Sequence, residues 1–352
     1  MMKNKINAIG VMSGTSLDGI DLVYVSFDNY AYRNFEILHA QTVPYNKEWK
    51  QLLQNAILNT KKELADLDVL YGRFLGTTIL NFITNFKIDT IDFVASHGHT
   101  VFHKPDEGIT LQIGNGKEIA KITNQKVVCD FRTQDVKLGG QGAPLVPIGD
   151  ELLFTDYDFC LNLGGFSNIS YQKDDNRIAF DICPVNIVLN HYAQKLGLDF
   201  DESGNIAKSG VVHQELLHQL NALSYYHQKP PKSLGLEWVQ QHVFPLIDNT
   251  ENEISTILRT FVEHAAQQIA KVIYKNDKVL VTGGGAFNDF FINRIQFYAE
   301  NSIDLPYSEI INFKEALVFA FLGLLKLENK INCLQSVTGA QKNHSSGVVF
   351  YP

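Results

Sequence analysis

A glycine-rich turn near the start of the chain joins two runs of residues that favour β-strands. The turn reads Ser13-Gly14-Thr15-Ser16-Leu17-Asp18-Gly19, between strand-like runs at 6–12 and 20–27. Because small residues let a backbone approach a ligand closely, such a turn can offer N–H and hydroxyl donors to phosphate oxygens. Asp18 and Asp21 add carboxylates that could bind Mg²⁺ recruited by the phosphates. The alternative is an ordinary hairpin, since Asp-Gly is itself a turn signal.

Two further glycine turns follow strand-like runs much later in the chain. One contains Gly164, Gly165, Ser167 and Asn168, and the other is Thr282-Gly283-Gly284-Gly285. A glycine turn at a strand-to-helix junction can also bind phosphate, because the first N–H groups of a helix point at the anion. Each turn alone is more often a simple tight turn, but three of them indicate a polyphosphate site. Neither a Walker A loop nor the G-x-G-x-x-G pattern is matched, so a P-loop or dinucleotide fold is not predicted.

Asp181 is the candidate for acid–base chemistry. It ends an apolar, strand-like run and directly precedes a helix-like segment. A carboxylate at that place would lie at the edge of a cleft and could act as a general base. The structural alternative is an N-terminal helix cap, a role in which Asp is also common.

Three more residues are candidates for substrate contacts. Arg132 could bind an anionic group through two hydrogen bonds, although an Arg near a strand end usually forms a surface ion pair. His97 lies in the cluster Ser96-His97-Gly98-His99-Thr100, which lacks the ligand spacing of a zinc site and is better explained by substrate contacts or loop structure. Glu315 stands at the start of a very apolar helical segment, where the helix dipole would also favour a carboxylate.

Composition and charge limit the class of protein. With 352 residues and 45% hydrophobic content, the chain can form two cored domains, since single cores stop growing near ~250–300 residues. A formal charge of -8 argues against a nucleic-acid surface. The sequence lacks an apolar run near the ~20 residues of a membrane span and begins with a strand-like run, so we expect a cytoplasmic protein without a membrane partner. Four scattered cysteines predict neither a zinc knuckle nor disulfides.

The order of elements indicates an α/β protein in two halves. Apolar spacing is helical over 48–86, and short strand-like runs follow before the glycine-rich run 138–142. The second half again opens with strand, turn and strand over 159–171. Further helical patterns occupy 185–196, 211–223 and 254–274, and a strand-like run occupies 278–281. The repeated order favours two lobes, with the glycine-rich run as their junction or as an active-site loop.

Six motifs form a pattern that runs from residue 9 nearly to the C-terminus. They are Gly10-Val11-Met12-Ser13-Gly14-Thr15-Ser16-Leu17-Asp18-Gly19-Ile20-Asp21, Ser96-His97-Gly98, Asp130-Phe131-Arg132, Gly139-Gly140-Gln141-Gly142-Ala143-Pro144-Leu145-Val146-Pro147, Leu161-Asn162-Leu163-Gly164-Gly165-Phe166-Ser167-Asn168-Ile169 and Val281-Thr282-Gly283-Gly284-Gly285-Ala286. In order and spacing they resemble the anhydro-N-acetylmuramic acid kinases, a family in the superfamily of sugar kinases, heat-shock ATPases and actin.

The resemblance implies a fold of two actin-like (ribonuclease H-like) lobes, each a mixed sheet flanked by helices, with the active site in the cleft between them. We expect an N-terminal lobe of residues 1–135 plus 336–352, carrying the first phosphate hairpin and part of the sugar site. Residues 136–335 would form a C-terminal lobe that carries the second phosphate turn, the catalytic aspartate and the adenosine side.

The resemblance also implies an activity. It is ATP-dependent conversion of 1,6-anhydro-N-acetylmuramic acid to N-acetylmuramic acid 6-phosphate, with hydrolytic opening of the anhydro ring, in peptidoglycan recycling. ATP and Mg²⁺ would be required, and a homodimer is suggested. Two alternatives stay open: a kinase of another sugar on the same scaffold, and a non-catalytic ATP-binding regulator of actin-like fold. Asp181 at its apolar strand end argues against the second.

Roles carry over to matching positions of this chain. Asp181 matches the catalytic aspartate that deprotonates the attacking water, and His97, Arg132 and Glu315 would contact the sugar. Asp18 and Asp21 would bind Mg²⁺ through water or phosphate. The expected ATP contacts are Gly14, Thr15, Ser16, Leu17, Asp18, Gly19, Ile20, Asp21, Gly164, Gly165, Ser167, Asn168, Gly283, Gly284 and Gly285.

The chain departs from the commonest pattern of this family in two places. Ile182-Cys183 stands where the family usually has Thr-Gly, and His99 stands where it usually has Gln. Since Asp181, Pro184 and Asn186 are retained, we expect the chemistry to be kept, while the exact sugar preference stays open.

Overall fold

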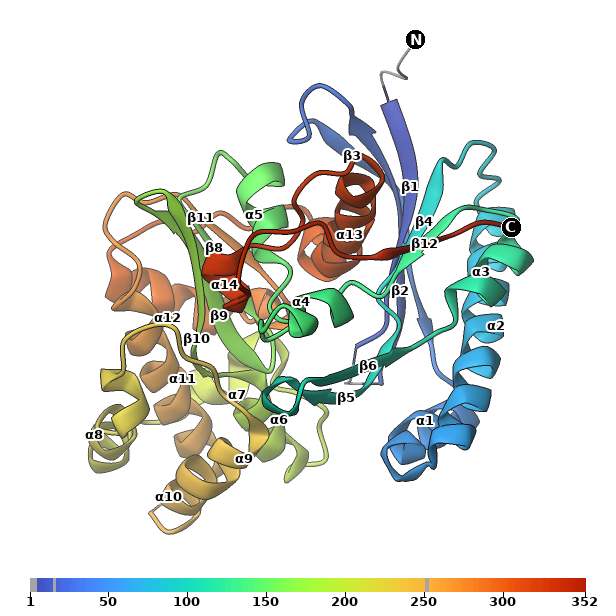
Figure 1. The fold of residues 1–352 in the computed structure, drawn as a ribbon. Coiled ribbons are helices and arrows are strands. Elements are labelled where there is room, and N and C mark those ends of the chain that lie inside the picture. Colours follow the sequence, from blue (N-terminus) through green and yellow to red (C-terminus); the bar gives the residue numbers. More distant parts are fainter. Residues whose placement is uncertain (1–4, 15–16, 251–252) are drawn as a thin grey trace. The chain divides into compact units, whose positions relative to one another are not determined.

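The computed structural model describes residues 5–14, 17–250 and 253–352 of the chain, and Figure 1 shows their helices and strands. They form two compact units, the first from Met1–Phe154 and Phe313–Pro352 and the second from Thr155–Asn312. The boundaries expected from the sequence lay at 135/136 and 335/336, whereas segments 136–154 and 313–335 belong to the first unit here. Each unit contains a β-sheet with helices, which confirms the α/β class.

The first unit is built on a six-stranded mixed sheet in the order β12-β7-β4-β1-β2-β3. Strand β2 runs antiparallel to β1 and β3, β4 runs parallel to both β1 and β7, and β12 runs antiparallel to β7. A separate two-stranded sheet pairs β5 with β6. The strands are β1 (Lys5–Met12), β2 (Gly19–Asp28), β3 (Phe35–Pro44), β4 (Phe93–Ser96), β5 (His99–Lys104), β6 (Ile109–Ile113), β7 (Val127–Cys129) and β12 (Val348–Phe350).

Helices cover both faces of the six-stranded sheet. Figure 1 shows α2 and α3 along one side of it and α13 along the other. The long helix α2 begins with a capping box, in which Thr60 and Glu63 satisfy each other's backbone N–H groups. The helices are α1 (Lys47–Asn55), α2 (Lys61–Asn85), α3 (Gly116–Thr123), α4 (Thr133–Lys137), α5 (Pro147–Leu153), α13 (Ser308–Leu327), within which the unit boundary falls, and α14 (Gln335–Thr338).

Alternation along β1 explains this layering. Ile9 and Val11 belong to the core that contains the buried face of α2. Gly10, between them, faces α13, and a Cβ atom on Gly10 would collide with the carbonyl oxygen of Ala316. The strand therefore packs directly on the helix backbone, which brings Glu315 and Ala316 close to the start of the first hairpin turn.

The second unit is built on a four-stranded sheet in the order β10-β9-β8-β11. Strands β8, β9 and β10 are antiparallel neighbours, while β11 runs parallel to β8. Its strands are β8 (Phe159–Leu163), β9 (Phe166–Lys173), β10 (Asn176–Pro184) and β11 (Val279–Thr282). Its helices are α6 (Asn186–Gln194), α7 (Asn205–Ser209), α8 (Gln214–Asn221), α9 (Leu236–Trp238), α10 (Phe244–Asp248), α11 (Ile254–Ala270) and α12 (Asp289–Ala299).

One hydrophobic core holds the second unit together. Phe159, Leu161 and Leu163 of β8 pack in it with the buried face of α11, including Phe261 and Ala265. Because strand side chains alternate, the residues between these three point to the other face of the sheet. That face carries the polar residues of the candidate site.

Two global expectations can be compared with the structure. Among the helices of the described residues, none combines the length and apolar character needed to cross a membrane. All four cysteines, Cys129, Cys160, Cys183 and Cys333, are buried and free of disulfides, as predicted.

Candidate active site

Four polar side chains form a row across the sheet of the second unit. Asp181 on β10 pairs with Asn168 on β9, and Asn168 pairs with Asn162 on β8. Asn162 pairs in turn with Thr282 on β11. Neighbouring strands lie about 4.7–4.9 Å apart, and directly paired residues share one face of a sheet. The adjacent Leu161 belongs to the hydrophobic core, so the polar row lies on the opposite face.

The glycine turn predicted to bind phosphate connects β8 to β9, next to the two middle residues of this row, Asn162 and Asn168. Its carbonyl oxygens accept hydrogen bonds from the start of α6: Val185 N–H donates to Gly165 (2.8 Å) and Asn186 N–H donates to Gly164 (3.3 Å). The Asn186 side chain also donates to the carbonyl of Leu163 (3.1 Å). With the carbonyls engaged by the helix, the N–H groups of the turn are what it can offer to an anion.

Ser167 follows this turn, but its hydroxyl bonds to the backbone of the neighbouring strand. It is fully buried, and its hydroxyl donates to the Cys183 carbonyl at 3.0 Å and accepts from the Cys183 N–H at 3.2 Å. These bonds hold an irregularity in the pairing of β9 and β10, where the register shifts between Asp181 and Cys183. Such a bulge re-aims the side chains next to it.

The third glycine run packs against the end of β8. Gly283 has a φ of 84°, and a Cβ atom there would lie 2.7 Å from Asn162 Oδ1. A Cβ atom on Gly285 would lie 2.8 Å from the Cβ of Leu163. Gly284 differs, because a Cβ atom on it would meet only Asn186 Nδ2, at 3.7 Å. Gly283 and Gly285 are therefore required by packing, while Gly284 borders open space.

A cavity of about 820 Å³ opens beside this glycine run, entirely within the second unit. Its volume is in the range of small-molecule and cofactor sites, roughly 300–1,000 Å³. Phe200 and Phe287, which are 59% and 46% exposed, give the wall apolar rings. Polar groups of Asn186 and Asn288 also line it. An aromatic base together with a hydroxylated sugar would match this mixture.

Asp181 combines partial burial with one backbone contact. The N–H of Leu234 donates to Asp181 Oδ2 at 2.9 Å, and the Tyr225 hydroxyl donates to the Asp181 carbonyl at 2.6 Å. Burial raises the pKa of the Asp181 carboxyl, and the Leu234 hydrogen bond partly offsets that rise. The cap of α6 is Val185, so the alternative of Asp181 as a helix cap is wrong.

The two residues that depart from the family pattern have buried side chains. Ile182 is 3% exposed and Cys183 is fully buried, both in the hydrophobic core. Burial raises the pKa of the Cys183 thiol to about 12. The two side chains therefore face the core, on the side of the strand opposite to Asp181.

In the first unit, the turn between β1 and β2 is tied to the loop after β4. The buried Ser13 hydroxyl donates to the Gly98 carbonyl at 2.8 Å, and His97 N–H donates to the Val11 carbonyl at 3.0 Å. Leu17 is buried with a φ of 59°. Ile20 is also buried, so a ligand could meet it only through its backbone. Thr15 and Ser16, two predicted ATP contacts, lie outside the described residues.

Two carboxylates flank this turn. Asp18 is exposed, while Asp21 is half-buried and accepts a hydrogen bond from the Thr42 hydroxyl at 2.6 Å. Burial raises the pKa of the Asp21 carboxyl, the Thr42 bond lowers it, and the negative charge of Asp18 raises it again. Carboxylate oxygens of this kind are the ligands that Mg²⁺ prefers. The pair therefore fits a magnesium ion that takes its other ligands from phosphate and water.

His97 and Arg132 form a directly bonded pair. Arg132 Nε donates to His97 Nε2 at 2.9 Å, and Arg132 Nη1 donates to the Gly142 carbonyl at 2.6 Å. Since Nε2 accepts, the neutral imidazole carries its proton on Nδ1, which donates to the Gly98 carbonyl at 2.8 Å. Burial, with the Arg132 charge, lowers the pKa of His97 well below its usual range. Burial also lowers the pKa of Arg132, to about 10.

Glu315 lies about two turns inside α13, which begins at Ser308. The expectation that it starts the helix is wrong, and the helix dipole does not explain it, because that effect is confined to the first turn. Glu315 is an exposed residue by its accessible surface, but many protein atoms lie near its carboxyl. This surrounding protein raises the pKa of Glu315, the charge of Arg132 lowers it, and that of Asp21 raises it. The three charged groups therefore influence one another within the first unit.

The structure thus brings the predicted residues together in two groups, one in each unit. The first unit holds the hairpin turn, Asp21, His97, Arg132 and Glu315, and the second holds the glycine turns and Asp181. Sequence reasoning missed Asn162, which lies within β8 just before the glycine turn, and Asn186, which begins α6. It also missed the Leu234 N–H, since a backbone contact over such a separation leaves no local signal.

Fold and site together define an α/β protein of the sugar-kinase class. The family model described as anhydro-N-acetylmuramic acid kinase matches residues 6–352. The chain therefore belongs to the anhydro-N-acetylmuramic acid kinase family, which confirms the resemblance seen in the sequence.

Curated relatives match over nearly their whole length. The anhydro-N-acetylmuramic acid kinase of Bacillus thuringiensis subsp. konkukian (strain 97-27) is 33% identical over 380 residues, with 98% of this chain and 99% of the relative covered. That of Aliivibrio fischeri (strain ATCC 700601 / ES114) is 34% identical over 363 residues, with 97% and 98% covered. Among solved structures, component A of the (R)-2-hydroxyglutaryl-CoA dehydratase of Acidaminococcus fermentans matches with a TM-score of 0.47 and 12% identity, over 90% of this chain and 96% of that one. A structural likeness this distant carries no functional conclusion.

Proposed function

We propose that this protein is a cytoplasmic, ATP-dependent kinase that converts 1,6-anhydro-N-acetylmuramic acid to N-acetylmuramic acid 6-phosphate in peptidoglycan recycling. The observation that carries the proposal is the polar row of the second unit. Asp181 lies on β10, the neighbour of the strand β9 that begins at the glycine turn that would bind phosphate, and its side chain is on the face opposite the core. One sheet edge therefore combines an anion-binding turn with a carboxylate whose burial makes it more basic.

In this proposal the adenosine of ATP is bound by the second unit. The cavity beside Gly284 and Gly285 has the size and the mixed lining for adenosine. The N–H groups of the Gly164-Gly165 turn would bind phosphate oxygens, since the turn's carbonyls are engaged by α6. The first hairpin turn would bind further phosphate oxygens, and Asp18 and Asp21 would hold Mg²⁺, which would offset the negative charge of the phosphates.

The reaction requires a base that takes a proton from water and a sugar oxygen, O6, that accepts the γ-phosphoryl group. Asp181 takes a proton from water as the water oxygen forms a bond to C1 of the sugar, and the C1–O6 bond breaks. The freed O6 forms a bond to the γ-phosphorus of ATP, and ADP leaves with the electron pair of the broken P–O bond. His97, Arg132 and Glu315 contact the sugar. Since His97 is neutral and donates its only proton to Gly98, it takes no part in proton transfer.

A steady-state assay of ADP release tests this proposal against its alternatives. We expect release that depends on 1,6-anhydro-N-acetylmuramic acid and Mg²⁺, with simple hexoses giving no more than background. Faster release with another sugar would assign the protein to a different substrate. ATP binding without phosphoryl transfer to any sugar would support the regulator instead.

A further inference from the structure

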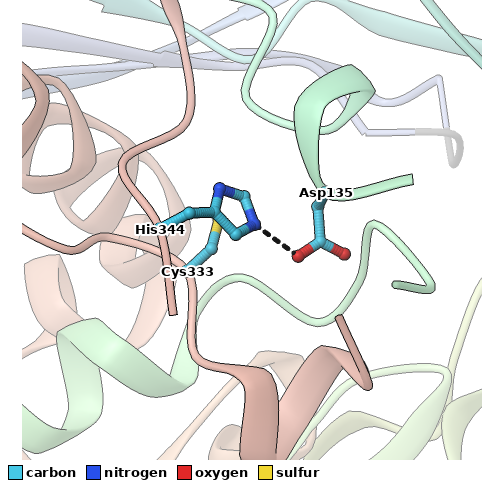
Figure 2. A group of neighbouring side chains, drawn as sticks. All are labelled: Asp135, Cys333 and His344. Atoms are coloured by element: carbon cyan, nitrogen blue, oxygen red, sulfur yellow. Dashed lines mark hydrogen bonds and ion pairs between the residues drawn. The ribbon is translucent and has the colours of Figure 1, made fainter. Parts of the chain in front are cut away.

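A buried cluster in the first unit joins α4 to two bridged residues near the C-terminal end of the chain. Asp135 of α4, Cys333 and His344 are 0%, 2% and 6% exposed, and their potential ligand atoms lie within 4.8 Å of one another. Figure 2 shows the His344 ring directed at the Asp135 carboxylate. His344 Nε2 lies 2.8 Å from Asp135 Oδ1. None of these residues belongs to the ATP or sugar contacts proposed above.

The hydrogen bonds of this cluster fix the proton positions. Gln134 Nε2 can only donate, and it lies 3.1 Å from His344 Nδ1, so Nδ1 is an acceptor. The imidazole proton is therefore on Nε2 and is donated to Asp135. The Thr338 hydroxyl donates to the same carboxylate oxygen at 2.8 Å, and the N–H of Gly142 donates to Oδ2 at 2.7 Å.

A metal ion is a poorer explanation of the cluster than this network. Both oxygens of Asp135 already accept bonds from protein donors, and both ring nitrogens of His344 are engaged. Burial raises the pKa of the Cys333 thiol to about 12, and metals bind the thiolate. The buried groups satisfy one another without an ion, as a structural network requires.

The network continues from Asp135 to the predicted sugar site through a single residue. Gly142 donates its N–H to Asp135 and accepts at its carbonyl oxygen from Arg132 Nη1. Gly142 has a φ of 67°, and a Cβ atom there would lie 2.9 Å from Val136 Cγ2. A Cβ atom on Gly140 would collide with the Asp135 carboxylate. The glycine-rich loop is thus shaped around Asp135, which explains why its sequence requires glycine.

We propose that Asp135 and His344 are positioning residues for Arg132. They fix Gly142, whose carbonyl holds one edge of the Arg132 guanidinium while His97 accepts from Nε. With those contacts set, the plane of the guanidinium is fixed, so its remaining N–H groups can bind the sugar in a fixed geometry. The inference rests on the proposed function insofar as it assigns Arg132 to the sugar. The link from His344 to Arg132 can be tested independently of that assignment.

The test compares His344→Ala, His344→Gln and the matched control Asp68→Asn. Asp68 is also a carboxylate of the first unit that accepts from a glycine N–H (Gly114, 2.8 Å) and from a side chain (Asn115, 2.7 Å). It has no hydrogen bond to Gly142 or Arg132 among the described residues. Gln at 344 can still place an N–H donor near Asp135, whereas Ala cannot.

Two readouts are recorded for each variant. The first is the nitrogen-15 NMR resonance of Arg132 Nε–H, assigned by its loss in Arg132→Lys. We expect it to shift and broaden in His344→Ala and to stay near its native position in His344→Gln and Asp68→Asn. The second is calorimetric affinity. We expect His344→Ala to bind the anhydro-sugar about tenfold more weakly, as for loss of one well-aligned charged hydrogen bond, with ATP affinity within about twofold.

The outcomes separate the inference from the proposed function. An unchanged Arg132 resonance in folded His344→Ala, or an equal change in Asp68→Asn, would overturn the positioning role whatever the ligand. So would stoichiometric zinc in the purified protein, which would make the cluster a metal site. If the native protein fails to bind the sugar while the resonance shifts as expected, the sugar assignment is wrong and the link from His344 to Arg132 stands.

Discussion

Asp181 on β10 lies directly opposite Asn168 on β9, in the strand that leads away from the Gly164-Gly165 turn. Strand β9 thus connects the proposed phosphate turn, at its start, to the proposed base on the neighbouring strand β10. The bulge that follows Asp181 is fixed by the buried Ser167 hydroxyl. The proposed base and the proposed anion-binding turn are therefore held in a fixed relation by the register of these strands.

Replacing Asp181 by Asn should remove turnover and keep ATP binding. The amide cannot accept the proton of water, and general-base contributions are typically about 10²–10⁴-fold in rate. Asp181 does not line the cavity assigned to adenosine, so the ATP dissociation constant should change by less than about twofold, under ~0.5 kcal/mol. Single-turnover rates and calorimetry measure the two quantities. Product formation at the native rate would remove Asp181 from the mechanism.

The acid limb of the rate profile should report the Asp181 carboxyl. Burial raises its pKa above the ordinary value of 3.8, and the base works only when ionised. Activity should therefore fall as pH falls through this raised pKa. Leu234→Pro removes the N–H that favours the ionised form, so the limb should move to higher pH, by up to about one unit.

Leu234→Ala is the control for that shift, because it shortens the side chain and keeps the N–H. Its acid limb should overlay that of the native protein in kcat/KM against pH. An identical displacement in both variants would mean that the Leu234 side chain, rather than its hydrogen bond, sets the basicity of Asp181.

Alanine at two adjacent glycines should have separable effects, one on stability and the other on ATP binding. Gly283→Ala places a Cβ atom against Asn162 at a positive φ, and strain of this kind costs about 1–3 kcal/mol. The unfolding temperature should fall. Gly284→Ala meets only Asn186 Nδ2 at 3.7 Å, so its stability should be native while its KM for ATP rises. An unaltered KM for ATP in Gly284→Ala would argue against nucleotide contact at this glycine.

Gly10→Ala should destabilise the first unit. The added methyl collides with the backbone of α13 at Ala316, and overpacking typically costs about 1–3 kcal/mol. Calorimetry should show a lower unfolding temperature than for Gly108→Ala. A Cβ atom at Gly108 would meet nothing within 4 Å, so that variant is strained only by its φ of 70°. Equal stability of the two variants would contradict the close packing of β1 on α13.

Local patterns predicted much of this structure. Helical spacing over 48–86 correctly predicted α1 and α2, and the glycine turns do follow β1, β8 and β11. These signals are local, because periodicity and turn residues act within a few positions. The strands β3 and β5 were not predicted. Both are half exposed and mix polar with apolar residues, which weakens alternation as a signal.

Long-range register could not be read from the sequence. Nothing local sets Asp181 opposite Asn168, or joins His97 to Arg132 across 35 positions. Glu315 shows a related limit. The apolar run marked the most continuous apolar part of α13, whereas the helix begins earlier, at Ser308, where Ile310 and Ile311 stand among polar residues.

The most direct test is mass spectrometry of the product made from 1,6-anhydro-N-acetylmuramic acid, ATP and Mg²⁺ in water enriched in oxygen-18. Ring opening by water and transfer to O6 predict a sugar phosphate that carries one heavy oxygen, at C1, and inorganic phosphate that carries none. A phosphorylated sugar without label, or labelled inorganic phosphate with the anhydro-sugar left intact, would contradict the proposed reaction.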